Sequence, residues 1–224
     1  MKVTFSKSES FINRLILHSL DNPEKIGLLS GQVGIIIVIA NYARQKKKYR
    51  IEDIADTLYD NVMRRVRHLS NIEFANGLSG ICWGIEYLVQ HGILEGPADE
   101  ICKSADKVIL DKNPLQTNDF SLETGLLGLW HYTWARIQGN MIVGLELPFP
   151  NEYLNLWLKI LTENQSVFPV GADKLLVDAI QGNLRTSELS VRPFIKNIRE
   201  LLIDDMSLRN GVAGYISLKY LTND

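Results

Sequence analysis

The sequence predicts an all-α protein, an α/α solenoid or a partial α/α toroid built from about five helical hairpins. Three observations favour this fold. A short glycine motif recurs at nearly constant spacing, amphipathic segments alternate with apolar ones, and only residues 141–147 compete as a strand, which we interpret as a loop. We expect residues 1–224 to form one domain.

A small polar residue followed by Gly-x-x-Gly occurs four times. The first glycines are 46, 48 and 86 positions apart, and 86 is close to two periods. We therefore expect a degenerate fifth copy at Gly171, although Lys174 stands where its second glycine should be. The four clear copies are Ser30-Gly31-Gln32-Val33-Gly34, Asn76-Gly77-Leu78-Ser79-Gly80, Thr124-Gly125-Leu126-Leu127-Gly128 and Asn210-Gly211-Val212-Ala213-Gly214.

Each period reads as an amphipathic helix followed by an apolar one. In residues 8–20, Phe11, Leu15 and Leu17 stand among polar residues, and residues 35–45 after the first motif are almost wholly apolar. A helix that is apolar all round is buried, whereas an amphipathic one keeps a wet face. The later amphipathic segments are 51–68, 97–111, 151–162 and 191–203, and the later apolar ones are 81–91, 129–137, 175–180 and 215–221.

The glycines indicate where a ligand would bind. Glycine at the start of each inner helix lets backbones approach closely and permits turns with positive φ. The N-termini of the inner helices then converge on one face, with unpaired N–H groups and positive dipole ends. We expect this face to bind a peptide or a partner protein near Asn76, Glu123, Thr124, His131 and Asn210.

Composition excludes several classes of protein. The formal charge of −2 gives no surplus of basic residues for nucleic acid, and we interpret residues 46–50 as a solvated helix end. Two cysteines, Cys82 and Cys102, make no disulfide framework and are interpreted as small buried thiols. Residues 1–10 have no apolar signal core, and residues 26–43 are short and interrupted for a membrane span. We expect a cytoplasmic protein that binds no membrane.

The spaced glycine turns followed by apolar helices resemble those of the lanthionine synthetase C-like (LanC-like) family. The best matches are residues 27–35, 76–81 and 210–214. The resemblance implies an α/α toroid, of about seven hairpins in that family, and cyclisation of precursor peptides by joining Cys thiols to dehydrated Ser or Thr. It also implies a zinc ion that deprotonates the thiol. Trp-Cys-Tyr-Gly and Cys-His-Gly motifs supply its two cysteines and one histidine, and a further histidine before a motif glycine acts as acid or base.

The chain departs from this pattern where zinc would be bound. The ligands belong one and two residues before the first glycine of a motif, and no such pair here contains cysteine or histidine. Cys82 precedes Trp83-Gly84 in the wrong order and inside a helix. We therefore expect no metal and no other cofactor, and a LanC-like pseudoenzyme that binds a peptide or a partner enzyme of a peptide-maturation pathway. The five pairs are Leu29-Ser30, Ala75-Asn76, Glu123-Thr124, Pro169-Val170 and Arg209-Asn210.

Two alternatives remain open. An α/α-toroid glycoside hydrolase could use Glu86, Asp119 or Glu123, with Trp83, Trp130 and Trp134 as sugar platforms. Against it, Asp119 and Glu123 suit a helix N-terminus and the tryptophans suit a core. His131 can likewise be a core histidine or an acid–base group. The other alternative is a structural module that forms a homodimer, because the last apolar helix has no outer cover in the sequence.

Overall fold

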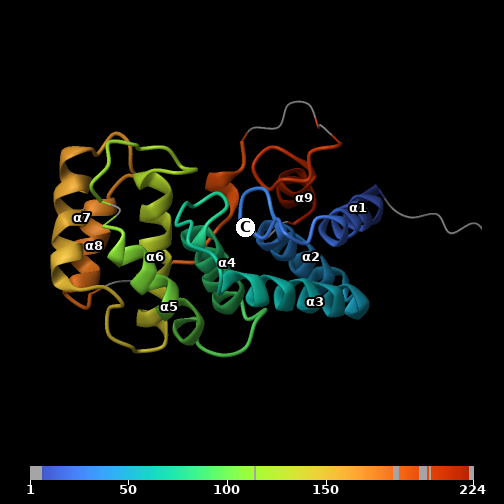
Figure 1. Cartoon of the computed structure of the whole chain (residues 1–224), viewed down its shortest axis with the longest axis horizontal. Coiled ribbons are helices and arrows are strands. Elements are labelled where there is room, and N and C mark those ends of the chain that lie inside the picture. The colour runs from blue at the N-terminus through green and yellow to red at the C-terminus, as the bar shows by residue number, and fades with distance from the viewer. Residues whose placement is uncertain (1–6, 114, 184–186, 197–200, 202, 222–224) are drawn as a thin grey trace, which may run out of the picture.

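The computed structural model describes residues 7–113, 115–183, 187–196, 201 and 203–221. Its regular elements are all helices, and no strand occurs in these residues, which confirms the predicted fold class (Figure 1). The elements are α1 (Lys7–Asp21), α2 (Gln32–Lys46), α3 (Tyr49–Val66), α4 (Leu78–Gln90), α5 (Ala98–Asp111), α6 (Leu126–Ile142), α7 (Asn151–Glu163), α8 (Ala172–Ile180), the 3₁₀ helix η1 (Arg192–Phe194) and α9 (Val212–Tyr220).

The helices form an inner and an outer layer. The inner helices α2 and α4 bury nearly every residue, whereas the outer helix α3 buries only Ala55, Leu58 and Val62. On α1, Phe11 and Leu15 are buried as expected, but Leu17 is 60% exposed. No helix of the described residues is long and apolar enough to cross a bilayer.

The inner helices are not arranged in sequence order. α4 contacts α2 and α6, whereas α9 contacts α1 and α2 and so lies next to the first hairpin (Figure 1). α7 and α8 lie together at the opposite end of the molecule (Figure 1). The fold is thus a partial α/α toroid in which the last helix returns to the first hairpin.

The four motif turns share one backbone geometry, which explains their glycines. The second glycine of each turn faces a carbonyl oxygen six positions earlier, and a Cβ atom there would lie 1.8–2.2 Å from that oxygen. The first glycines cap the inner helices with extended backbone, at φ between −135° and −107°. Close approach of the backbone therefore requires the glycines, and the positive φ that we expected is absent from all four turns.

Two expectations about the C-terminal part are wrong. Gly171 caps α8 with φ 79°, and a Cβ atom there would have no neighbour within 4 Å, so Gly171 does not form a fifth turn of the same kind. Within the described part of the helix expected at residues 191–203, only the short η1 is helical, and residues 197–200 and 202 lie outside the described part.

Residues 187–196, which we call the central segment, run through the middle of the toroid. At one end, Gln138 Nε2 of α6 donates to the carbonyl of Ser187 at 2.9 Å. At the other end, the backbone N–H of Lys196 donates to the carbonyl of Arg209 at 2.9 Å, beside the fourth motif turn. Between them, Val191 and Phe194 are buried. The chain therefore fills the centre of its own ring.

Candidate functional site

Backbone hydrogen bonds join the four motif turns side by side. The N–H of Leu208 donates to the carbonyl of Leu29, the N–H of Leu29 to the carbonyl of Ala75, and the N–H of Ala75 to the carbonyl of Glu123, each at 2.9 Å. The spatial order is therefore fourth, first, second and third turn. This arrangement brings the N-termini of α9, α2, α4 and α6 together on one surface, which we call the turn face.

An ion pair connects the two ends of this row of turns. Arg209 Nε lies 2.6 Å from Glu123 Oε1, and both side chains are partly exposed. Arg209 Nη1 also donates to the carbonyl of Phe194 in the central segment at 2.9 Å. Glu123, one of the expected binding residues, is therefore already engaged by a cation.

Three other expected binding residues are exposed on the turn face. Asn76 Oδ1 accepts a hydrogen bond from Ser30 Oγ at 3.1 Å, which links the first two turns. Thr124 Oγ1 donates to Asp119 Oδ2 at 2.6 Å, and this bond, with those from Ser121, lowers the pKa of Asp119. Asn210 donates its N–H to Ser207 Oγ at 3.2 Å. The turns thus bring Asn76, Glu123, Thr124 and Asn210 onto one surface.

His131 lies below that surface, in the second turn of α6. Its ring centroid is 6.2 Å from that of Phe74 and 5.0 Å from that of Phe194, and no hydrogen-bond partner occurs in the part of the chain described. Loss of hydration lowers its pKa to about 4. The imidazole is therefore neutral near pH 7 and behaves as a core histidine.

Glu86 belongs to a separate, buried charge network. Arg136 of α6 is fully buried and donates to Glu86 Oε1 of α4 at 2.6 Å, and to Asp106 Oδ2 and Asp99 Oδ1 of α5 at 2.7 Å each. Tyr132 also donates to Asp106. One guanidinium thereby ties three helices together.

Burial shifts the ionisation of this network. Desolvation raises the pKa of Glu86 against the opposing attraction of Arg136. Desolvation, with the charge of Asp106 nearby, also raises the pKa of Tyr132. Gly139 gives Glu86 its space, because a Cβ there would lie 2.1 Å from Glu86 Oε2. The network has the contacts of a structural core element.

Glu86 is not brought near the other two carboxylates proposed for glycoside hydrolysis. Glu86 lies against Gly139, whereas Asp119 and Glu123 lie at the start of α6, about 20 Å away at 1.5 Å per residue. Glycosidase carboxylates are roughly 5–9.5 Å apart. Trp83 and Trp130 are buried, and Trp134 stacks on Trp130 with ring centroids 5.7 Å apart. The tryptophans therefore belong to the core.

The residues present do not fit the zinc site that the resemblance implies. Cys82 and Cys102 are buried between α4 and α5, with Cys102 Sγ 3.9 Å from the carbonyl of Cys82. The neighbouring Cys82 thiol and burial raise the pKa of Cys102, which disfavours a thiolate. Across the described residues, no three His, Cys, Asp or Glu side chains group so that they could hold a metal ion.

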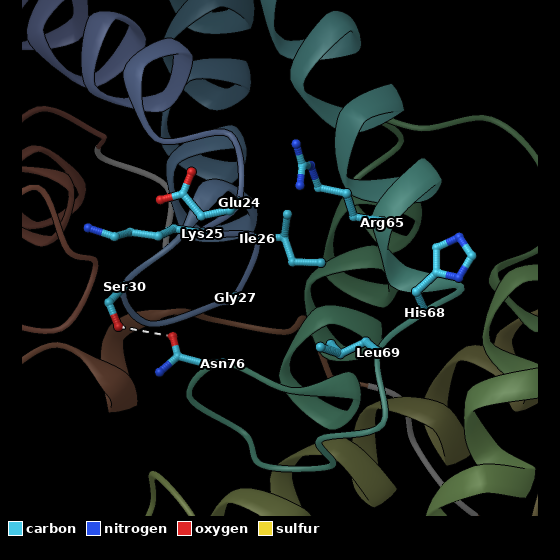
Figure 2. Close-up of a pocket in the computed structure, with 9 residues that line it drawn as sticks. All are labelled: Glu24, Lys25, Ile26, Gly27, Ser30, Arg65, His68, Leu69 and Asn76. Carbon is cyan, nitrogen blue, oxygen red and sulfur yellow. Dashed lines mark hydrogen bonds between the residues drawn. The ribbon is translucent and has the colours of Figure 1, made fainter.

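A pocket that no expectation from the sequence included lies at the edge of the turn face. It has a volume of about 570 Å³ and lies between the loop that precedes α2 and the C-terminal end of α3 (Figure 2). The run Arg64-Arg65-Val66-Arg67-His68 was the signal that could have indicated it. The lining residues are Glu24, Lys25, Ile26, Gly27, Ser30, Arg65, His68, Leu69 and Asn76.

Comparison with known proteins gives one match. The family model described as "Lanthionine synthetase C-like protein" matches residues 22–183, which is well over half of the chain. This range contains the first three motif turns, the helices α2 to α8 and the buried charge network. No curated protein and no solved structure is significantly similar to the chain.

Proposed function

The chain belongs to the lanthionine synthetase C-like family, and on this premise we propose that it serves a lanthipeptide-type modification pathway by binding a peptide or a partner enzyme without cyclising the peptide itself. The observation that carries the proposal is the composition of the turns. The positions that would hold zinc are occupied by side chains such as Ser30, Asn76 and Thr124, and Glu123 is paired with Arg209.

The turn face has the chemistry of a recognition surface. Small polar side chains are exposed beside four helix N-termini, whose positive dipole ends favour carbonyl and carboxylate groups of a peptide. The central segment fills the ring below it with Phe194. A peptide would therefore lie across the turn face rather than enter the ring.

Selection from a phage library of random dodecapeptides tests this proposal. We expect clones that bind the wild-type chain and lose binding to a Thr124→Arg/Asn210→Arg variant, since both side chains are exposed on the turn face. Gln45→Arg is the matched control, because Gln45 is exposed near the C-terminal end of α2, whereas the turn face lies at the N-terminal end of that helix. Equal binding to all three proteins would contradict the proposal.

Metal analysis tests the non-catalytic part of the proposal. We expect the purified chain to carry far less than one zinc per molecule. Stoichiometric zinc, together with thiol addition to a dehydrated test peptide, would overturn it.

A second candidate function is self-association, and the observation that favours it concerns the end of the molecule formed by α7 and α8. Among the described elements α8 packs chiefly against α7, and apolar side chains on this pair are exposed. Sedimentation velocity should then show a homodimer, and a Leu156→Glu/Val177→Glu variant should be monomeric. A wild-type monomer at high micromolar concentration would exclude it. These exposed side chains are Leu156, Leu175, Val177 and Ile180.

A further inference from the structure

We propose that the pocket between the loop at residues 24–30 and the end of α3, which we call the α3 pocket, binds a carboxylate of an acidic peptide segment through Arg65. The inference rests on the proposed function, since it names the part of the peptide that one edge of the turn face would recognise.

The α3 pocket is continuous with the turn face. Ser30 and Asn76, which are hydrogen-bonded to each other, belong both to the first two motif turns and to the pocket wall (Figure 2). Gly27 lets the two chain segments meet, because a Cβ there would lie 2.5 Å from the Cα of Asn76. A peptide lying across the turns would therefore reach the pocket without leaving the surface.

Arg65 is held in place by residues that are themselves fixed. Its Nε donates to Asn61 Oδ1 at 3.1 Å. Asn61 Nδ2 donates to the carbonyl of Pro23 at 2.9 Å and to Gln32 Oε1 at 2.6 Å. Gln32 is buried and donates to the carbonyl of Ser19 at 2.9 Å. The guanidinium is thus oriented before any ligand arrives.

The two terminal nitrogens of Arg65 remain available. Neither has a hydrogen-bond or ion-pair partner among the residues that the structure describes, whereas Arg14, Arg136 and Arg209 each hold a carboxylate. A guanidinium presents its terminal N–H groups as a fork that matches the two oxygens of a carboxylate. A fixed and unused fork is therefore suited to bind one.

The other residues that line the α3 pocket indicate which ligand groups would lie next to the carboxylate. Lys25 adds a second cation, His68 adds an imidazole, and Glu24 is the acidic member of the lining. Ile26 lies between Lys25 and Arg65, and Leu69 lies below them, so both contribute apolar groups to the lining (Figure 2). The complementary segment carries a Glu or Asp with an apolar side chain next to it.

Two peptides that differ only in charge test the inference. One is an end-blocked octapeptide that alternates Leu and Glu, and the other replaces every Glu with Gln. Binding is followed by NMR through the backbone amide signals of Gly27 and Leu69. We expect the Glu peptide to shift these signals and to bind about tenfold more tightly than the Gln peptide, as for loss of one charge-assisted pair.

Variants of α3 test whether Arg65 is the residue that binds the peptide carboxylate. Arg65→Gln should weaken binding of the Glu peptide about tenfold, and Arg65→Lys should recover only part of it because an ammonium cannot bind both oxygens in a fork. Arg64→Gln is the matched control, because Arg64 is also exposed on the same turn of α3 but does not line the pocket. Its effect should stay below about twofold.

Several results would overturn the inference. They are equal affinity for the Glu and Gln peptides, equal weakening by Arg64→Gln and Arg65→Gln, and shifts by sodium acetate as strong as those by the peptide. Binding that shifts Thr124 and Asn210 but leaves Gly27 and Leu69 unchanged refutes the α3 pocket while it supports the proposed function. Failure of the library selection would instead count against the proposed function itself.

Discussion

Arg209 Nε lies 2.6 Å from Glu123 Oε1, although the two residues belong to the fourth and third turns, at opposite ends of the hydrogen-bonded row. Each residue stands two positions before the first glycine of its motif. The ion pair therefore joins the two ends of the turn face directly.

Removing this ion pair should loosen the turn face slightly. Glu123→Gln should lower the free energy of unfolding by at most about 1 kcal/mol, because both side chains are partly exposed. Arg209→Met should cost more, about 1–3 kcal/mol, since the carbonyl of Phe194 also loses its donor. Urea unfolding of both variants measures the difference, and equal losses would contradict it.

Replacing the second glycine of a motif turn by alanine should lower the free energy of unfolding, although this glycine lies in a helix. Gly80 lies in α4, where alanine would ordinarily stabilise a helix by about 0.5–1 kcal/mol. Here its Cβ would lie 1.8 Å from the carbonyl oxygen of Phe74, so we expect Gly80→Ala to cost about 3 kcal/mol or more. Chemical unfolding measures this cost.

Gly171→Ala is the control for that substitution. Gly171 has free space around it but a positive φ of 79°, so alanine should cost only about 1 kcal/mol of backbone strain. A smaller loss for Gly80→Ala than for Gly171→Ala would show that close approach is not what the motif requires.

His131 should make stability depend on pH below neutrality. Its pKa of about 4 in the folded protein is below the ordinary 6.5, so the unfolded chain binds more protons between these values. Its contribution, up to about 3 kcal/mol, is complete above pH 6.5 and is lost as the pH falls towards 4. In His131→Phe this loss should disappear, which unfolding curves between pH 4 and 7.5 can measure. Parallel pH profiles of the two proteins would refute this role.

The buried network should depend on Arg136 more than on any single carboxylate. Arg136→Met leaves Glu86 and Asp106 buried without their cation and should cost about 3–5 kcal/mol. Adding Glu86→Gln to Arg136→Met should recover part of this loss, because it removes one of the uncompensated charges. Thermal and urea unfolding of the single and double variants measure the recovery. A double variant less stable than Arg136→Met would contradict the idea that uncompensated buried carboxylates cause the loss of stability.

The sequence predicted most helices because their signals are local. The i, i+4 recurrence of Ile54, Leu58 and Val62 depends only on neighbouring residues, and α3 confirmed it. The prediction of an amphipathic helix at residues 191–203 was wrong, because Val191 and Phe194 are apolar for a reason other than helix packing. They fill the centre of the ring from a segment whose described helical part is the short η1.

The candidate site was predictable only in part. The repeated turns placed Asn76, Thr124 and Asn210 on one face, because each stands at the same position of the same motif. The pairing of Glu123 with Arg209 depends on the return of α9 to the first hairpin, which no local pattern reveals. For the same reason the sequence leaves Glu86 a candidate acid, because its partner Arg136 lies 50 positions away.

The return of α9 to the first hairpin also has a consequence for how the chain folds. Arg14 Nη2 of α1 donates to the carbonyl of Ile203 at 2.6 Å, across 189 positions of sequence. Contacts this distant form late, because closing a long loop costs entropy before the contacts can repay it. During synthesis, the apolar surfaces of α1 and α2 that face α9 stay exposed to water and to other chains until α9 has been made and has docked. The slowest step of refolding should accordingly be the docking of α9.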